Sequence, residues 1–240
     1  MAIVEWKVED GVGIITMNNG ENRHNPLFAK GMLDAFGELE KDKAVSSVVI
    51  TSSDQKNWSQ GIDLDWMTGR MGEKDFQSVK DFIYVMNEVF KRALLFPTPL
   101  ICAINGHAVA NGAIFSCACD FRFMRSDKGF FFFPEVDIGI PFLPGMIAFV
   151  KKSIPFYKFE EMLYSGKRYT ALELERHHVI VKACENEEAL MSEAFGLAKT
   201  YRKKRGIFGE MKKRMHKEMI EVLDKEDPPF VEAMQLFVGD

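Results

Sequence analysis

The sequence has few cysteines, no excess of basic residues and no long apolar run. Its 240 residues include four cysteines, Cys102, Cys117, Cys119 and Cys184, without a histidine or second cysteine pair at zinc-ligand spacing. We therefore expect reduced core thiols and no metal. The 31 basic and 35 acidic residues give a formal net charge of -4, which lacks the basic footprint of a nucleic-acid-binding protein. No stretch approaches the roughly 18 apolar residues that a membrane span requires.

We expect no targeting signal at either end of the sequence. The first ten residues, MAIVEWKVED, are charged from the start, which is atypical of a signal peptide. The last residues do not form a peroxisomal address. We expect a soluble protein in a reducing compartment, cytoplasmic, with neither a nucleic acid nor a membrane as partner.

Alternating strand and helix patterns organise the chain up to about Val150. Apolar runs around Asp10-Gly11 predict a hairpin, Asn25 and Pro26 predict a helix start, and Phe76 begins a long amphipathic helix. This order predicts an α/β core with mostly parallel strands, followed by a helical last third. We further expect a mobile segment at residues 68–74 and a short strand at residues 179–181.

The stretch PLICAINGHAVANGAIFSCACD, residues 99–120, is the most informative part of the sequence. It predicts a buried strand over residues 100–104, a turn at Asn105-Gly106, a second turn at Ala110-Asn111-Gly112 and a helix of small residues from about Ala113. Such an arrangement directs backbone N–H groups and a helix N-terminus at one point. That point suits an anion or a carbonyl oxygen that becomes negatively charged.

A second glycine turn, WSQGIDL at residues 58–64, follows the strand at residues 48–51. Together with NGHAVANG, the Cys119-Asp120 pair and the run from Pro134 to Gly139, it resembles the crotonase (enoyl-CoA hydratase/isomerase) superfamily. The resemblance implies a ββα superhelix over residues 1–181, with active site and CoA site, and a C-terminal helical region at residues 182–240 for oligomerisation or as a lid. It further implies a coenzyme A thioester as substrate, no permanently bound cofactor, and a homotrimer or hexamer.

The resemblance also assigns roles to residues of the two turns. It implies that the backbone N–H groups of Ile62 and Asn111 hold the thioester oxygen of an acyl-CoA, as an oxyanion hole. Asn111 departs from the family pattern, where Gly or Ala is commoner, and a Cβ restricts the backbone there. Residues expected to contact CoA are Arg23, Gln60, Gly61, Asp63 and Leu64.

The acid–base residue that the resemblance implies is Glu135. Hydratases of this family use two glutamates, and the position of the first is occupied here by Ile114. Keeping only the second glutamate is the pattern of Δ3,Δ2-enoyl-CoA isomerases, in which one base moves a proton from C2 to C4. The preceding phenylalanines predict an apolar surrounding that raises the pKa of the Glu135 carboxyl. Alternatives are hydration or thioester hydrolysis by the same superfamily, or a catalytically silent CoA-binding protein.

Other polar residues are interpreted as structural or solvated. His24, His177, His178 and His216 have no partner pattern and are expected at the surface. Ser59 and Ser116 lack a His/Asp setting that marks a nucleophile. The basic runs at residues 202–205 and 212–217 are expected to be solvated helix faces.

Overall fold

The strands of the protein form one large sheet and two small ones in the computed structural model, which describes residues 2–239. The large sheet has the order β1-β2-β4-β7-β9-β11. Its first two strands form the predicted antiparallel hairpin, and the other strands add in parallel. Their bounds are β1 (Val4–Glu9), β2 (Val12–Met17), β4 (Ser47–Ser52), β7 (Leu100–Ile104), β9 (Phe121–Arg125) and β11 (Lys182–Cys184). The predicted parallel core is confirmed.

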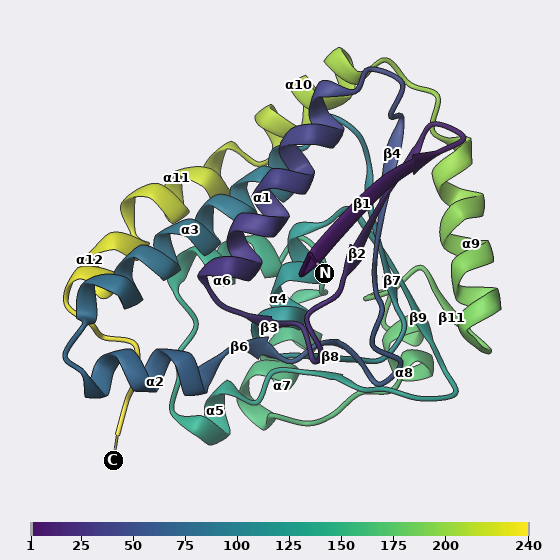
Figure 1. Ribbon diagram of the computed structural model, residues 1–240. Helices are drawn as coiled ribbons and strands as arrows, with labels where there is room; N and C mark the ends of the chain where they lie inside the picture. Colours follow the sequence, from purple (N-terminus) through teal and green to yellow (C-terminus); the bar gives the residue numbers. More distant parts are fainter. Residues whose placement is uncertain (1, 240) are drawn as a thin grey trace.

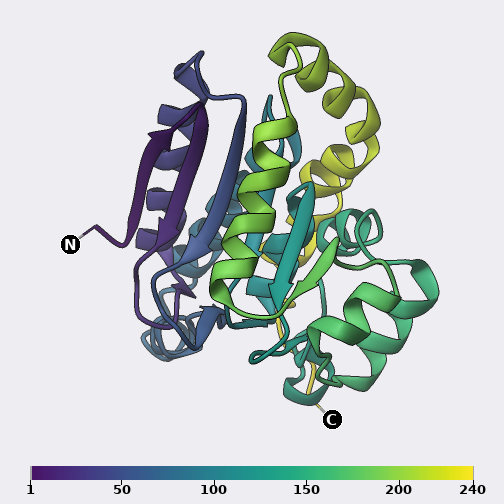
Figure 2. The same cartoon turned by 90° about the vertical axis from the view of Figure 1, so that its right-hand side faces the viewer.

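Side chains of the large sheet alternate between two hydrophobic cores. In β7, Leu100, Cys102 and Ile104 belong to the larger core, whereas Ile101 and Ala103 belong to the smaller one. Successive side chains of a strand point to opposite faces, so a strand buried on both sides is apolar throughout. Helices α1 (Pro26–Lys41) and α3 (Phe76–Leu95) cover the first face, and α9 (Glu187–Thr200) covers the second (Figures 1 and 2).

Helix starts follow the local sequence signals. The side chain of Asn25 accepts a hydrogen bond from the N–H of Phe28, and Pro26 is the first residue of α1. The other helices are α2 (Leu64–Gly72), α4 (Asn111–Ala118), α5 (Glu135–Ile138), α6 (Pro144–Val150), α7 (Phe156–Ser165), α8 (Ala171–Arg176), α10 (Arg205–Met215), α11 (Lys217–Lys225) and α12 (Asp227–Glu232). Every helix among residues 2–239 is too short or too polar to cross a membrane.

Two small parallel sheets lie beside the large one and carry the predicted turns. One has the order β10 (Phe131–Phe132), β8 (His107–Val109), β5 (Asn57–Ser59), and the other pairs β3 (Arg23–His24) with β6 (Gly61–Ile62).

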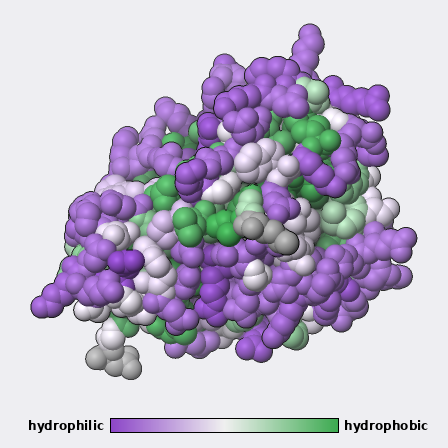
Figure 3. Space-filling view, in the orientation of Figure 1, coloured by the Kyte–Doolittle hydropathy of each residue, from purple (hydrophilic) through white to green (hydrophobic). Residues whose placement is uncertain are grey.

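Polar side chains cover most of the molecular surface that faces the viewer in Figure 3, and only scattered apolar areas lie between them.

Two local predictions concern segments outside the two turns. Residues 68–72 of the segment predicted to be mobile, 68–74, belong to helix α2, whose N-cap is Asp63. The strand predicted at residues 179–181 is wrong. The last parallel strand is β11, not residues 179–181, because β11 is the segment that lies in register with β9. The proposed domain boundary after residue 181 thus falls directly before a strand of the main sheet.

The C-terminal helices bury polar groups that were expected at the surface. Lys212 of α10 is buried, and its Nζ donates to a carboxylate oxygen of Asp120 at 2.8 Å. His216 is also buried, with Nδ1 at 2.8 Å from the carbonyl oxygen of Leu94. The Nζ of Lys212 also donates to the carbonyl oxygen of Ala93 at 3.1 Å. The contacts to Ala93 and Leu94 hold the α10–α11 segment against α3 and give the buried polar groups their partners.

Candidate active site

The first glycine turn presents the N–H of Ile62 away from its neighbouring strand. In the parallel β3–β6 pair, His24 is in register with Ile62, and the N–H of Asp63 donates to the carbonyl oxygen of His24 at 2.9 Å. N–H groups of successive residues in a strand point in alternate directions, so the N–H of Ile62 points away from β3. The side chain of Asp63 then caps α2 by accepting from the N–H of Trp66.

The second turn places Asn111 at the first position of α4. The first intrahelical hydrogen bond there runs from the N–H of Ile114 to the carbonyl oxygen of Ala110 at 2.9 Å. The N–H groups of the first helical turn have no intrahelical acceptor, which leaves that of Asn111 available to a ligand. The unusual backbone is at Ala110, with φ 50° and ψ -127°, and not at Asn111 as the sequence suggested. Strained backbone of this kind clusters at functional sites.

The two turns touch each other backbone to backbone. The φ of Gly61 is +80°, in the left-handed region. A methyl group placed on Gly61 would lie 2.9 Å from the nitrogen of Asn111 and 2.9 Å from the carbonyl oxygen of Val109. A methyl group on Gly112 would lie 2.7 Å from the carbonyl oxygen of Ser59. Only glycine permits these approaches, so the peptide groups at Ile62 and Asn111 are held close together.

Glu135 is a buried carboxyl in apolar surroundings. It begins the short helix α5, and only 7% of the residue is exposed. Burial raises the pKa of its carboxyl to about 8, and Oε2 has no hydrogen-bond partner among the described residues. Phe131 and Phe133, which precede it, are fully buried. The predicted raised pKa is therefore reproduced, with desolvation as its cause.

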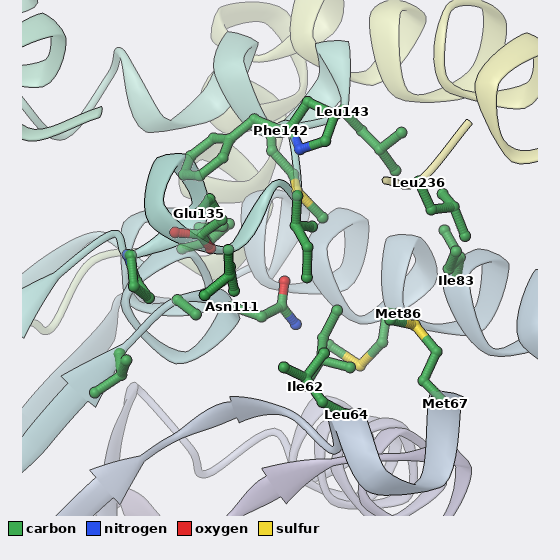
Figure 4. Close-up of a pocket in the computed structure, with 18 of the residues that line it drawn as sticks. Ile62, Leu64, Met67, Ile83, Met86, Asn111, Glu135, Phe142, Leu143 and Leu236 are labelled. Atoms are coloured by element: carbon green, nitrogen blue, oxygen red, sulfur yellow. The ribbon is translucent and has the colours of Figure 1, made fainter. Parts of the chain in front are cut away.

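One pocket joins these groups, with a cavity volume of about 250 Å³. Figure 4 shows Glu135 and Asn111 at one end, with Met67, Met86, Ile83 and Leu236 at the other. Ile114, at the position of the first hydratase glutamate, lines the same pocket and is 1% exposed. The pocket is thus apolar over most of its length, with one carboxyl and two backbone turns at one end, which suits an acyl chain joined to an activated carbonyl.

The predicted CoA contacts fall into two groups. Arg23, Gln60 and Leu64 line the pocket. The three residues with predicted catalytic roles, Ile62, Asn111 and Glu135, also line it. Gly61 and Asp63 are not among the lining residues, because Gly61 packs against the second turn and Asp63 caps α2.

Sequence reasoning missed His24, which was expected at the surface and is fully buried. Its Nε2 lies 2.9 Å from Oγ of Ser59, and its Nδ1 lies 2.8 Å from Nδ2 of Asn111. Ser59, interpreted as lacking a histidine neighbour, therefore has one. The only signal for this site in the sequence is the position of His24 directly before the Asn25 cap, and that spacing does not reveal which side chains surround the ring.

Comparison with known proteins places the chain in a family. Residues 7–227 match the family model described as enoyl-CoA hydratase/isomerase. The chain belongs to this family. It is 27% identical over 212 residues to "Enoyl-CoA delta isomerase 3" of Arabidopsis thaliana, covering 85% of this chain and 87% of that protein. It is 29% identical over 221 residues to "Enoyl-CoA delta isomerase 2, peroxisomal" of the same plant, covering 88% and 91%.

Hydratases are also among the similar proteins. A short-chain-enoyl-CoA hydratase of Clostridium acetobutylicum is 28% identical over 184 residues, covering 76% of this chain and 69% of that protein. The crystal structure of an enoyl-CoA hydratase from Bacillus halodurans superposes with a TM-score of 0.86 at 20% identity, covering 96% and 92% of the two chains. The predicted crotonase fold with its C-terminal helical region is confirmed, and this family member is an acyl-CoA-acting enzyme.

Proposed function

We propose that this enoyl-CoA hydratase/isomerase family member moves the double bond of a 3-enoyl-CoA to C2. The observation that carries the proposal is a single buried carboxyl, Glu135, facing the pocket while Ile114 occupies the position of a second one. Isomerisation requires one base, whereas hydration benefits from two carboxyl groups. The similarity to two plant enoyl-CoA delta isomerases supports this choice.

The proposed reaction uses Glu135 as a proton shuttle. Its carboxylate removes a proton from C2, and the electron pair moves through the carbonyl carbon to the thioester oxygen. The N–H groups of Ile62 and Asn111 donate to that oxygen, each contributing about 3 kcal/mol of transition-state stabilisation. Glu135 then returns the proton to C4, and the double bond forms between C2 and C3. The N-terminus of α4 adds its positive dipole beside the oxygen.

The experiment that tests the proposal is incubation with a 3-enoyl-CoA in D₂O. Ultraviolet absorbance of the conjugated thioester reports 2-enoyl-CoA, and mass spectrometry reports deuterium and any added water. Because Glu135 is 7% exposed, we expect most product molecules to keep the substrate proton at C4. A 3-hydroxyacyl product from 2-enoyl-CoA, with no conversion of 3-enoyl-CoA, would support hydration instead. No turnover on a thioester panel would support a silent CoA-binding protein.

Leu236 is expected to limit the length of the acyl chain. It lies at the apolar end of the pocket beside Ile83 (Figure 4), and it is 7% exposed. The segment that carries it is held to α5 by a hydrogen bond from the N–H of Val238 to the carbonyl oxygen of Gly139 at 2.8 Å. Leu236→Ala should raise kcat/KM for longer acyl chains relative to shorter ones by about tenfold, since burial of one or two further methylene groups contributes about 0.8 kcal/mol each.

The matched control for this variant is Phe237→Ala. Phe237 is the next residue, is 38% exposed and does not line the pocket. Its replacement should leave the chain-length preference unchanged. If both variants shift the preference alike, the effect comes from loosening of the segment and not from the wall that Leu236 forms.

A further inference from the structure

The ring of His24 lies between the two turns of the active site. It stacks on Phe28, with ring centroids 4.1 Å apart and an interplanar angle of 15°, and no part of the residue is exposed. Its backbone belongs to β3, which is paired with Gly61 and Ile62 of the first turn. Its side chain contacts Asn111 of the second turn. One residue thus contacts both turns.

The hydrogen bonds around the ring fit one tautomer. Ser59 has a single hydroxyl proton, and its Oγ lies 2.8 Å from the carbonyl oxygen of Asn22, which only accepts. That proton is therefore used, so the Nε2 of His24 must donate to Oγ, which also accepts from the N–H of Gly61 at 3.1 Å. Nδ1 is then unprotonated and accepts from Nδ2 of Asn111 at 2.8 Å. In this neutral ring, the Nε2 proton meets an acceptor and Nδ1 meets a donor.

A second proton on the ring would disrupt this arrangement. It would have to sit on Nδ1, where it would face the amide protons of Asn111. Burial opposes that protonation as well, and lowers the pKa of His24 to about 3. The ring is therefore suited to hold its neighbours and not to exchange protons with a substrate.

We propose that His24 is a positioning residue that fixes the separation of the two turns, and thereby the oxyanion hole, through its hydrogen bonds to Ser59 and Asn111. The inference rests on the proposed role of the N–H groups of Ile62 and Asn111. The backbone of His24 aligns the N–H of Ile62 through the β3–β6 pairing. The ring of His24 orients Asn111, whose backbone carries the second N–H group. A displacement of about 1 Å at such a site costs about 10²-fold in rate.

The test compares His24→Phe, His24→Asn and His177→Phe in the full chain. Phenylalanine keeps a ring against Phe28 and loses both hydrogen bonds, whereas asparagine keeps an acceptor for Asn111. His24→Phe should lower kcat for 3-enoyl-CoA by about 10- to 100-fold while KM changes by less than about threefold. His24→Asn should recover part of the loss. His177 is half-buried, bonds to Tyr157 and does not line the pocket, so His177→Phe should behave as the wild type.

A measurement on a bound, unreactive acyl-CoA tests the positioning role of His24 independently of the proposed reaction. The carbonyl stretching frequency of a bound, unreactive saturated acyl-CoA thioester falls when its oxygen accepts hydrogen bonds. Difference infrared spectra should show this lowering in the wild type and a clearly smaller one in His24→Phe. Asn111→Ala keeps the backbone N–H and loses the amide, so it should show the same smaller lowering, and it carries the test should His24→Phe fail to fold.

The double variant decides whether the two side chains act together. If His24 acts through Asn111, then His24→Phe with Asn111→Ala should lose no more kcat than the larger single loss. Losses that multiply, or an unchanged carbonyl frequency in His24→Phe, would overturn the proposal. A wild-type protein that does not isomerise 3-enoyl-CoA but shows a His24-dependent carbonyl shift would reject the proposed reaction and keep this inference.

Discussion

Glu135→Gln is expected to lower kcat for isomerisation of a 3-enoyl-CoA by about 10³-fold, with little change in the affinity for a saturated acyl-CoA. Glutamine has nearly the shape of glutamate, so the buried pocket is kept, but it cannot take a proton from C2. Steady-state kinetics and calorimetric binding of the saturated thioester measure the two effects. Full activity in this variant would show that another group is the base.

The pH dependence of the wild type follows from the same group. The carboxyl is active as a base when ionised, and burial raises its pKa to about 8. The kcat/KM value should therefore rise about tenfold per pH unit below pH 8 and level off above it, since this parameter reports the free enzyme. The remaining activity of Glu135→Gln should lack that rise.

The stability of this variant supplies an independent check. The unperturbed pKa of the carboxyl is 4.5 and the folded value is about 8, so unfolding releases a proton between these values. The protonated Glu135 therefore contributes all of its stabilisation below about pH 4.5, and this contribution to the free energy of unfolding is lost as the pH rises towards 8. Glutamine does not titrate, so the variant should be more stable than the wild type at pH 8, by about 2–4 kcal/mol in urea unfolding. When a functional residue destabilises the folded state, its replacement gives a protein that is more stable but inactive.

Gly61→Ala is expected to lower both stability and activity. The new methyl group would lie 2.9 Å from the nitrogen of Asn111, and the φ of +80° at this position is unfavourable for alanine. Strain and overpacking together should reduce the free energy of unfolding by about 2–5 kcal/mol. Because the clash is with an N–H group of the proposed oxyanion hole, kcat should also fall by about 10²-fold or more at temperatures where the variant is folded.

The matched control is Gly69→Ala in helix α2. A methyl group there meets no atom within 4 Å, and alanine favours a helix by about 1 kcal/mol over glycine. This variant should be as active as the wild type and equally or more stable. Wild-type activity and unchanged stability in Gly61→Ala would show that the two turns do not need their close approach.

Much of the fold follows from local signals in the sequence. The N-cap at Asn25, the paired glycine turns and the alternating apolar strands depend on neighbouring residues only, and the structure confirms the elements that they predict. The apolar surroundings of Glu135 were also predictable, because the four consecutive phenylalanines at residues 130–133 require a largely buried setting. The roles of Ile62, Asn111 and Glu135 in catalysis stay predictions.

The amino-acid sequence by itself determined the parallel α/β core, the two glycine turns and the choice of Glu135 as the candidate acid–base residue. The periodicity of apolar residues, the positions of glycines and the helix-capping residues are signals that depend on only a few neighbouring residues. The tertiary structure alone decided the surroundings of His24, the burial of Lys212 and the choice of β11 as the last strand. Each of these depends on which distant segment lies alongside, as Ser59 and Asn111 do for His24. The local sequence around a polar residue does not predict its burial, because burial becomes favourable only when the folded chain supplies hydrogen-bond partners.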